Sequence, residues 1–379
     1  MTALRVGFDT SPLYGPKTGV GFAVEAVRDA FMAQAAAGSG GSAGQVELVP
    51  YVLSLRARPA PPTTRLPIPA AVAQRCWAVG DHPRADRWLR DIDVLHGTNY
   101  VVPPSRQPRV VSVYDCWFLR HPDSATPNVR LAGRVLRRAV AGGAVVHASS
   151  HATADAVREL LPGAAVHTVH LSALTLPAPP AEAPIASLAG RPYVLAIGTL
   201  ERRKNLPRLV AAFGRLAAEQ ADLQLVLAGG DGDDRRAIDE AVDALGEHAS
   251  RVLFTGRISE PVRSWLLHHA AVLAYPSLDE GFGFPLLDAM QARVPVVASD
   301  AGSIPEVAGD AALLCQATDV DALAANLSLA ITSPSVRLDL VTAGTRRLDH
   351  FSWQRCAREL AAVYRAAIAG NGPSPTEPT

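Results

Sequence analysis

Short apolar runs rich in β-branched residues alternate along this chain with longer segments rich in Ala, Leu and Arg. The alternation is typical of βα units, in which helices connect parallel strands. It recurs in two halves, and 379 residues exceed the usual extent of one hydrophobic core. We therefore predict an α/β fold with two doubly wound domains, joined by a hinge, and a cleft at the carboxyl ends of both sets of strands.

The apolar runs give the expected positions of the strands and helices. Strands are predicted in the first half at 4–8, 46–51, 94–96, 110–113, 145–148 and 167–170. In the second half they are predicted at 193–197, 223–228, 252–254, 272–275 and 296–298. The main helices are predicted at 22–37, 206–219, 234–246, 260–270 and 284–292.

Segments without such a pattern divide the chain. Residues 176–191 are rich in Pro and Ala, which indicates a linker between domains. A similar segment, 56–69, is predicted to be a surface loop, and the last ten residues a disordered tail. The predicted organisation is a first domain, a linker, a second domain and a tail, at 1–178, 179–191, 192–350 and 370–379.

The composition excludes several classes of function. Lys and Arg together number 36, as do Asp and Glu, so no overall basic field would recruit nucleic acid. The four cysteines are scattered and include no C-x-x-C pair, which argues against a disulfide framework and a structural zinc site. Neither a signal peptide nor a run of about 18 apolar residues occurs. We therefore expect a cytoplasmic protein whose membrane contact is at most peripheral, at the inner face.

Residues 276–290, P-S-L-D-E-G-F-G-F-P-L-L-D-A-M, carry the clearest functional pattern. Glu280 precedes a Gly-Phe-Gly loop, whose glycines let a ligand approach the main chain. Pro285 suits the first turn of a helix, and a helix N-terminus favours phosphate. The combination fits a polyhydroxylated anion such as a nucleotide-sugar. The alternative is an ordinary helix start with acidic residues near its dipole.

Residues 198–205, G-T-L-E-R-R-K-N, follow a predicted strand and precede a predicted helix. Gly198 would permit close approach of a ligand, and Arg203 and Lys204 would supply positive charge for a diphosphate. Taken alone, the pattern is equally well explained by basic residues at a helix start. Taken with 276–290, it predicts a site built from two loops.

Together the two motifs resemble those of the retaining glycosyltransferases of family 4, also called glycosyl transferases group 1, which have the GT-B fold. Those enzymes carry G-T-L-x-x-R-K-N before a helix and E-G-F-G-x-P-x-x-E-A-M further on. The resemblance covers the second half densely and the first half thinly, and implies two Rossmann-like domains. It also implies that the last helix, 351–369, packs back on the first domain. Further matches are F-T-G-R-I (254–258), P-V-V-A-S (295–299), G-S-I-P-E (302–306) and F-S-W (351–353).

The resemblance assigns roles to residues of both motifs. Glu280 would bind hydroxyls of the donor sugar, while Arg203 and Lys204 would stabilise the departing diphosphate. Asp288 stands where the family has a glutamate that holds the ribose hydroxyls, and it is shorter by one methylene. Arg293 replaces a glycine that is usual in the family. The other implied donor-binding residues are Gly198, Thr199, Arg257, Ile258, Gly281, Phe282, Gly283 and Phe284.

In the first half, a Gly-rich turn precedes the predicted helix 22–37. The resemblance implies that Gly19, Val20 and Gly21 face the leaving phosphate and the acceptor. The turn does not match a dinucleotide-binding fingerprint or a P-loop. Taken alone, it is better explained as the start of a helix.

Three further residues of the first half are candidates for the site. His96 follows a predicted strand and could act in catalysis through a substrate hydroxyl or a proton; the alternative is a packed histidine with satisfied nitrogens. Asp115 is an acceptor-site candidate in a segment where the family often has His-Asp, although Tyr114 replaces the histidine here. Ser150 either faces the cleft or caps the helix that follows it.

No metal and no cofactor are expected, because the nucleotide-sugar is a substrate. Residues 231–234 contain a D-x-D pattern that metal-dependent glycosyltransferases of another fold use. Here the pattern follows two glycines after a predicted strand, and a solvated turn with a helix cap is the better explanation.

Four arginines recur at helical spacing in the first half and form one basic face. A solvated surface is the plain interpretation, and docking to an anionic membrane is the alternative. The four residues are Arg130, Arg134, Arg137 and Arg138.

We therefore interpret the chain as a hexosyltransferase that acts with retention of anomeric configuration. The donor would be GDP-mannose or a UDP-sugar, and the acceptor a hydroxyl of a glycan, a glycolipid, another lipid-linked acceptor or a small molecule. Two alternatives are a nucleotide-sugar epimerase of similar fold and a non-catalytic relative that binds a nucleotide-sugar.

Overall fold

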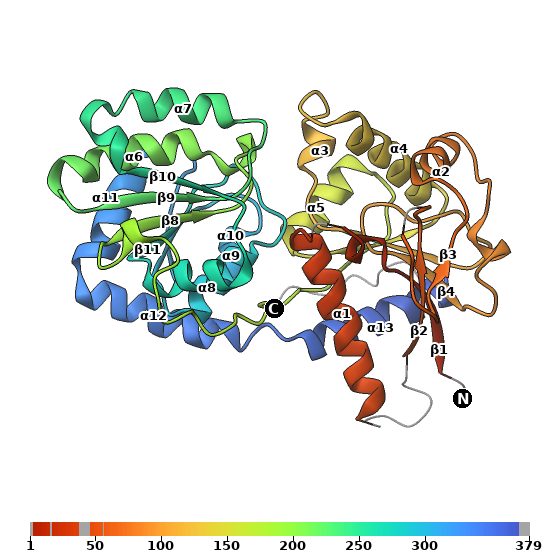
Figure 1. Cartoon of the computed structure of the whole chain (residues 1–379). Coiled ribbons are helices and arrows are strands. Elements are labelled where there is room, and N and C mark those ends of the chain that lie inside the picture. The colour runs from red at the N-terminus through yellow and green to blue at the C-terminus, as the bar shows by residue number, and fades with distance from the viewer. Residues whose placement is uncertain (1–2, 16, 38–45, 56, 371–379) are drawn as a thin grey trace. The chain divides into compact units, whose positions relative to one another are not determined.

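The computed structural model describes residues 3–15, 17–37, 46–55 and 57–370. The chain divides into two compact units (Figure 1). The second unit is Ser172–Phe351, and the first unit holds the chain up to Leu171 and again from Ser352. The predicted tail, apart from Gly370, lies outside the described residues.

A seven-stranded parallel sheet forms the centre of the first unit, in the order β3-β2-β1-β4-β5-β6-β7. All residues of β4 and β6 are buried, as expected for a parallel sheet that is covered on both faces. The strands are β1 (Leu4–Asp9), β2 (Val46–Val52), β3 (Thr64–Arg65), β4 (Val94–Gly97), β5 (Arg109–Val113), β6 (Val145–Ala148) and β7 (Val166–Thr168).

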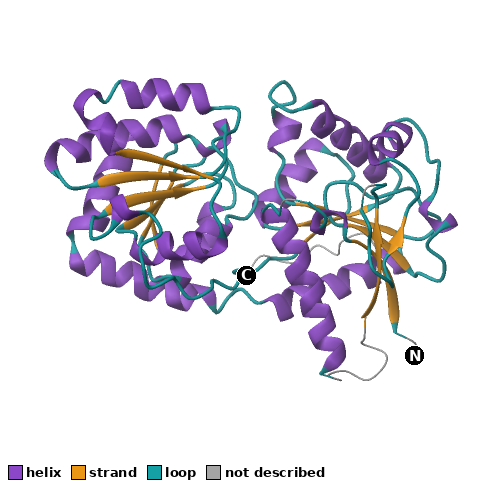
Figure 2. Ribbon diagram, in the orientation of Figure 1, coloured by secondary structure: helices purple, strands orange, loops and turns teal. Residues whose placement is uncertain are grey.

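Helices cover both faces of this sheet (Figure 2). Helices α1 (Gly19–Ala36) and α13 (Trp353–Ala369) pack against each other. Helices α4 (Pro127–Ala141) and α5 (His151–Leu160) bury their apolar faces in one cluster with β5, β6 and β7. The remaining helices of this unit are α2 (Ala70–Trp77) and α3 (Trp117–Arg120).

The second unit contains a six-stranded parallel sheet in the order β10-β9-β8-β11-β12-β13. Its strands are β8 (Tyr193–Ile197), β9 (Gln224–Ala228), β10 (Val252–Gly256), β11 (Val272–Tyr275), β12 (Val296–Ser299) and β13 (Ala312–Cys315). The helices are α6 (Leu206–Glu219), α7 (Arg235–Asp243), α8 (Glu260–His269), α9 (Phe284–Gln291), α10 (Ile304–Ala308), α11 (Val320–Thr332) and α12 (Pro334–Leu348). Helices α6, α7 and α11 share one core cluster with this sheet, and α8, α9 and α12 lie on the other face (Figure 1).

Helix α6 shows how directly the sequence pattern determines an element. Its buried residues are spaced three and four apart and form one apolar stripe on the core. Pro207 suits the first turn, and Gln220, in an extended conformation, ends the helix. The observed bounds are the predicted ones, 206–219.

Two short strands were missed. Strand β3 lies within 56–69, predicted to be a surface loop, and β13 was not predicted. Both lie at the edge of their sheets, and none of their residues is fully buried. Strand β3 has two residues, Thr and Arg, and so lacks the apolar run by which buried parallel strands are recognised. Strand β13 has such a run, Ala-Leu-Leu-Cys, but its residues are only partly buried and a four-residue apolar run alone does not distinguish a strand from a helix segment.

Several boundaries also differ from the prediction, among them those of α1, β7 and α7. Helix α1 begins at Gly19 rather than at residue 22, because N–H groups of a first turn need no partner within the helix and glycine is tolerated there. Strand β7 ends at Thr168, so His170 lies beyond it. Helix α7 ends at Asp243, and Gly246–Arg251 form a separate 3-10 helix.

Among the helices of the described residues, none combines the length and apolar character needed to span a bilayer.

Each sheet has one point where the strand order reverses: between β1 and β4, and between β8 and β11. In doubly wound sheets, ligands bind outside the carboxyl ends of the strands at such a point. Gly198 follows β8, and Pro276 follows β11. The two motifs of the second half therefore begin at the switch point of the second sheet.

A buried polar network joins α13 to the first sheet. His96 Nδ1 lies 2.8 Å from the Tyr364 hydroxyl, and His96 Nε2 lies 2.8 Å from Ser112 Oγ. Ser112 Oγ lies 2.8 Å from His147 Nδ1, and His147 Nε2 donates to the carbonyl of Val169 at 3.1 Å. Burial lowers the pKa of both histidines, that of His147 to about 4, so both are neutral at pH 7.

We expect Tyr364→Phe to lower the free energy of unfolding of the first unit by about 1–3 kcal/mol, because it leaves a buried nitrogen of His96 without its partner. Urea denaturation followed by circular dichroism measures this effect. Tyr14→Phe is the matched control, since Tyr14 is exposed. Equal stabilities of the two variants would show that the network does not hold α13.

Candidate active site

Two loops lie side by side at the carboxyl ends of β8 and β11, which are neighbouring strands. The backbone N–H of Leu278 donates to the carbonyl of Arg203 at 2.7 Å. The side-chain amide of Asn205 donates to the carbonyls of Pro276 and Ala317, at 2.9 and 2.7 Å. These bonds fix the segment 198–205 against the segment 276–290.

Glu280 joins the two loops through its charge. Lys204 Nζ donates to Glu280 Oε1 at 2.6 Å, and Arg203 Nη1 donates to Glu280 Oε2 at 2.5 Å. The three side chains are nearly buried, with exposed fractions of 6% for Glu280, 12% for Lys204 and 15% for Arg203. The triad by itself carries one excess positive charge, which suits a diphosphate, although the partly exposed Glu201, which also pairs with Arg203, offsets part of it.

The ionisation of Glu280 depends on these cations. Burial alone would raise the pKa of its carboxyl group, but Lys204 and Arg203 outweigh burial and hold the pKa at about 2, below the ordinary 4.5. Glu280 is therefore ionised at every physiological pH. An ionised carboxylate can accept hydrogen bonds from the hydroxyls of a sugar.

Further contacts hold the two cations in place. Arg203 Nη2 donates to Glu201 at 2.8 Å. Lys204 Nζ lies 3.2 Å from the Tyr275 hydroxyl and 4.8 Å from the centre of its ring. Each cation thus has a second anchor, which reduces the reorganisation that a ligand would require.

Gly302 explains one of the further sequence matches. It has φ +57°, and a Cβ atom there would lie 2.5 Å from the carbonyl oxygen of Glu280. The next residue, Ser303, donates its backbone N–H to that oxygen at 3.0 Å. The G-S-I-P-E segment therefore supports the loop from behind, where no side chain fits.

Asp288 lies on α9 and is buried. One carboxylate oxygen accepts a hydrogen bond from Arg263 on α8, and the other has no hydrogen-bond partner among the described residues. Burial raises the pKa of Asp288 to about 6, although the charge of Arg263 and its hydrogen bond lower it. Sequence reasoning missed Arg263, because nothing in the spacing indicates that α8 faces α9 at this point.

The other predicted donor-binding residues of the Glu280 loop lie between Glu280 and the start of α9. The ring of Phe282 is buried in edge contact with Phe284 and Phe351. Gly283, at φ +95°, directly precedes the helix, and Gly281 is buried. Residues 281–283 are all buried, and Phe282 contributes to the loop through the packing of its ring.

The remaining predicted residues lie at the same edge of the sheet. A Cβ atom at Gly198 would lie 3.1 Å from Lys204 Cε, so Gly198 makes room for that side chain. Thr199 is exposed. Arg257 and Ile258 follow β10, and a Cβ atom at Gly230 would lie 3.1 Å from Arg257 Cγ. Arg257 thus lies over the end of β9.

Arg293 follows α9 with φ +59°, in the left-handed region. Glycine adopts this conformation without cost, which explains why a glycine is usual at this position in the family. Other residues occupy the region at a cost of about 1–2 kcal/mol.

In the first unit, Gly19, Val20 and Gly21 form the first turn of α1 rather than a loop before it. The N–H groups of a first turn have no acceptor within the helix. The three residues thus remain compatible with a phosphate-binding role, although as part of α1.

The three other candidates of the first unit differ in their surroundings. His96 is buried with both ring nitrogens engaged inside the unit, so a direct catalytic role for it has no support in the structure. Asp115 accepts from the Tyr100 hydroxyl and from the backbone N–H of Trp117, both at 3.1 Å. Ser150 is buried and caps α5 by accepting from the N–H of Thr153 at 3.0 Å.

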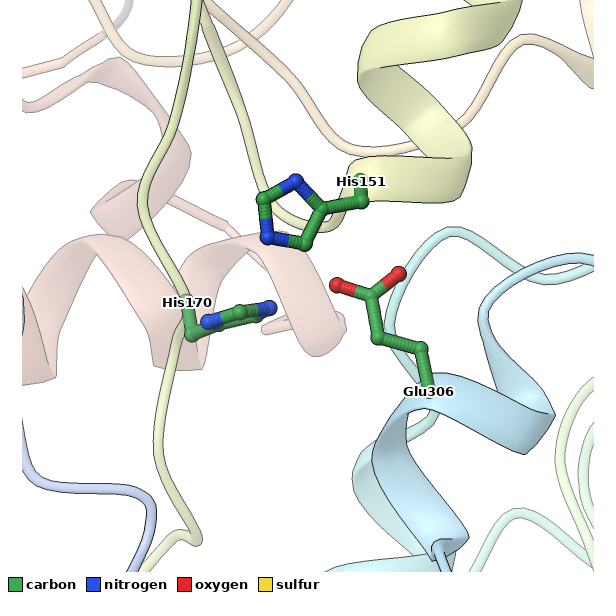
Figure 3. A group of neighbouring side chains, drawn as sticks. All are labelled: His151, His170 and Glu306. Carbon is green, nitrogen blue, oxygen red and sulfur yellow. The ribbon is translucent and has the colours of Figure 1, made fainter. Parts of the chain in front are cut away.

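Two histidines at the carboxyl edge of the first sheet were not predicted as site residues. His151 begins α5 and His170 follows β7, and their ring centres are 5.4 Å apart at an interplanar angle of 77° (Figure 3). Glu306, also labelled in Figure 3, belongs to α10 of the second unit. His151 directly follows the capping Ser150, and that position is the one signal that could have indicated it.

The basic face of α4 borders a hollow of about 520 Å³. Arg130 and Arg137 donate to backbone carbonyls, and within the described residues Arg134 has no hydrogen-bond or ion-pair partner. Helix α4 contains no acidic residue. The lining combines these arginines with apolar residues: Phe118, Leu119, Pro122, Pro127, Arg130, Gly133, Arg134 and Arg137.

Two of the aspartates in 231–234 already have partners. Asp231 accepts from Arg235 at 2.7 Å, and Asp233 accepts from the backbone N–H of Arg202 at 3.0 Å. Asp234 occupies the N-cap position of α7 but makes no capping bond with its side chain.

The family model described as Glycosyl transferases group 1 matches residues 191–333. O-antigen chain mannosyltransferase B of Escherichia coli is 30% identical over 297 residues, which cover 75% of this chain and 78% of that protein. This chain belongs to the glycosyl transferases group 1 family. A second relative of the glycosyltransferase, MMP alpha-(1->4)-mannosyltransferase of Mycolicibacterium hassiacum, is 37% identical over 172 residues, 44% of this chain and 41% of that protein.

Solved structures show the same fold as this glycosyltransferase. Sucrose-phosphate synthase from Thermosynechococcus elongatus has a TM-score of 0.71 at 19% identity, covering 98% of this chain and all of that one. HepE of Anabaena, in complex with UDP and glucose, has a TM-score of 0.66 at 16% identity, covering 97% of this chain and all of that one. The predicted family and the predicted GT-B fold are confirmed.

We expect Glu280→Gln to lower the free energy of unfolding of the glycosyltransferase by about 3 kcal/mol at pH 7. The pKa of the Glu280 carboxyl group is about 2 in the folded protein and 4.5 ordinarily, and that difference corresponds to a stabilisation of this size. A lowered carboxyl pKa stabilises the fold above pH 4.5, and the contribution is lost as the pH falls towards 2. Urea denaturation over this pH range measures the effect.

Glu201→Gln is the matched control, because Glu201 pairs with the same arginine but is one-third exposed, and its loss should cost below about 1 kcal/mol. If both variants had the same stability at pH 7, the triad would not hold the loops together.

Proposed function

We propose that this glycosyltransferase transfers a hexose from a nucleoside diphosphate sugar to a hydroxyl group of an acceptor, with retention of anomeric configuration and without a metal ion. The observation that carries the proposal is the buried triad of Arg203, Lys204 and Glu280 at the switch point of the second sheet. Its cations suit a diphosphate, and its carboxylate suits the hydroxyls of a sugar.

In the proposed reaction, the bond between the anomeric carbon and the diphosphate breaks, and the diphosphate leaves with its negative charge. Arg203 and Lys204 stabilise that charge, and the N-terminus of α9 adds a favourable dipole. Glu280 orients the sugar by accepting hydrogen bonds from its hydroxyls. As the new glycosidic bond forms, the acceptor hydroxyl passes its proton to an oxygen of the departing diphosphate.

We propose mannose as the sugar, because relatives of the chain are named as mannosyltransferases. A glucose donor is the other candidate, since HepE was solved with UDP-glucose. The acceptor is proposed to be a glycan, a lipid-linked acceptor or a small molecule. The relatives give no support to the epimerase alternative.

We expect Lys204→Ala to lower kcat by about 10²–10³-fold with GDP-mannose or a UDP-hexose, because one stabilising charge on the leaving group is lost. Release of the nucleoside diphosphate measures turnover, and nuclear magnetic resonance of the product reports its anomeric configuration. Arg236→Ala, at an exposed arginine of the same unit, should leave kcat unchanged.

Four results would contradict the proposal. Full activity of Lys204→Ala would remove the role of the triad, and an inverted product would remove retention. Activity that is lost in chelator and restored by manganese would show that a metal is required. Donor binding without turnover on any acceptor would favour a non-catalytic relative.

We also propose that the basic face of α4 docks on an anionic membrane, where each arginine contributes about 1 kcal/mol. Arg134→Gln should then weaken binding to phosphatidylglycerol vesicles about fivefold, and added salt should weaken it further. Co-sedimentation measures binding, with neutral phosphatidylcholine vesicles and Arg236→Gln as controls. Equal binding to both kinds of vesicle would contradict the docking.

A further inference from the structure

Arg263 is held between two carboxylates. Its Nε and Nη2 atoms donate to Glu260 Oε2 at 3.1 and 2.9 Å, and its Nη1 atom donates to Asp288 Oδ2. Glu260 belongs to the same helix, α8, and is partly exposed, whereas Asp288 belongs to α9 and is buried. The pair with Glu260 therefore fixes the guanidinium group in the orientation that reaches Asp288.

Asp288 is only half satisfied by this contact. Its Oδ1 atom is buried and has no hydrogen-bond partner among the described residues. A buried acceptor without a partner is costly and is rare in native proteins, so it calls for an explanation. A hydroxyl donor supplied by a ligand would satisfy it.

Asp288 lies on the same face of α9 as the residue that opens the helix. It follows Phe284 by four residues, and that spacing places side chains above one another on a helix. The start of α9 directly follows the Glu280 loop. The unpartnered oxygen of Asp288 thus lies on α9, the helix that starts directly after the loop of the proposed donor site.

We infer that Arg263 is a positioning residue for donor binding: it keeps Asp288 ionised and turned so that Oδ1 can accept a hydrogen bond from a hydroxyl of the donor. The inference rests on the proposed function, because it takes the ligand to be a nucleoside diphosphate or its sugar. It also explains how an aspartate can serve where the family has a longer glutamate, since its orientation is set by α8.

The inference predicts a dependence on pH. Burial raises the pKa of Asp288 to about 6; of the charged groups that face it, Arg263 on α8 lowers this pKa and Glu260, also on α8, raises it. Binding should therefore weaken as the pH falls through about 6 and Asp288 takes up a proton. Removal of the Arg263 charge raises this pKa further, which moves the loss of binding to higher pH.

Calorimetric titration of the full chain with UDP and with GDP, at pH values from about 5.5 to 8.5, tests the inference. Arg263→Gln should bind each nucleotide about tenfold more weakly than the unmodified protein at pH 7, because one hydrogen bond to a charged acceptor is lost. Its affinity should recover at the highest pH. Arg263→Lys should keep most of the affinity at pH 7. Arg236→Gln, at an exposed arginine, should change nothing.

Asp288→Asn separates positioning from a general structural role. It cannot ionise, so the dependence of its affinity on pH reports only the terminal phosphate of the nucleotide, whose second pKa is about 6. Adding Arg263→Gln to it should leave that profile unchanged and cost little more. If Arg263→Gln weakened binding equally at all pH values, or left the pH profile unchanged, the inference would be wrong. If the unmodified protein bound neither nucleotide, the proposed function itself would fail.

Discussion

The carboxylate of Glu280, buried between Arg203 and Lys204, is the interaction on which the candidate site depends. It joins loops that follow β8 and β11, which are neighbours in the sheet although far apart in the chain. A buried charge is costly unless it is paired and hydrogen-bonded, and here both carboxylate oxygens are used. The same bonds hold two cations in fixed positions at the place proposed to bind a diphosphate.

Two carboxylates of the second unit show how the surroundings set ionisation. Both are buried, and burial alone raises the pKa of each. Glu280 faces two cations and its pKa falls to about 2, while Asp288 faces one arginine, shared with Glu260, and its pKa rises to about 6. Glu280 is therefore a fixed charge, whereas Asp288 titrates close to physiological pH.

The fold and the pairing of the two motifs could be predicted from the sequence. Buried parallel strands have continuous apolar runs, and all strands of such a sheet end at one edge, so motifs that follow neighbouring strands meet there. The edge strand β3 lacks such a run, and β13 has one of only four residues, which alone does not distinguish a strand from a helix segment; both were missed. The start of α1 was placed three residues late, because glycines in a first turn resemble a loop.

Side-chain partners between elements could not be predicted. Arg263 reaches Asp288 only because α8 packs against α9, and no spacing in the sequence reports that contact. The sequence was compatible with a catalytic role and with a packed role for His96. The hydrogen bond between His96 and Tyr364, a residue near the C-terminus, favours the packed role. Local pattern identifies the strands and loops, while tertiary packing decides what each side chain touches.

The chain contains only two lysines, Lys17 in the first unit and Lys204 in the candidate site, which permits a direct test. Protein labelled with nitrogen-15 lysine should give two backbone amide signals, assigned with Lys17→Arg. If the donor binds at the triad, the Lys204 signal shifts and saturates as UDP or GDP is added. A Lys204 signal that stays in place while calorimetry records nucleotide binding would contradict the central claim.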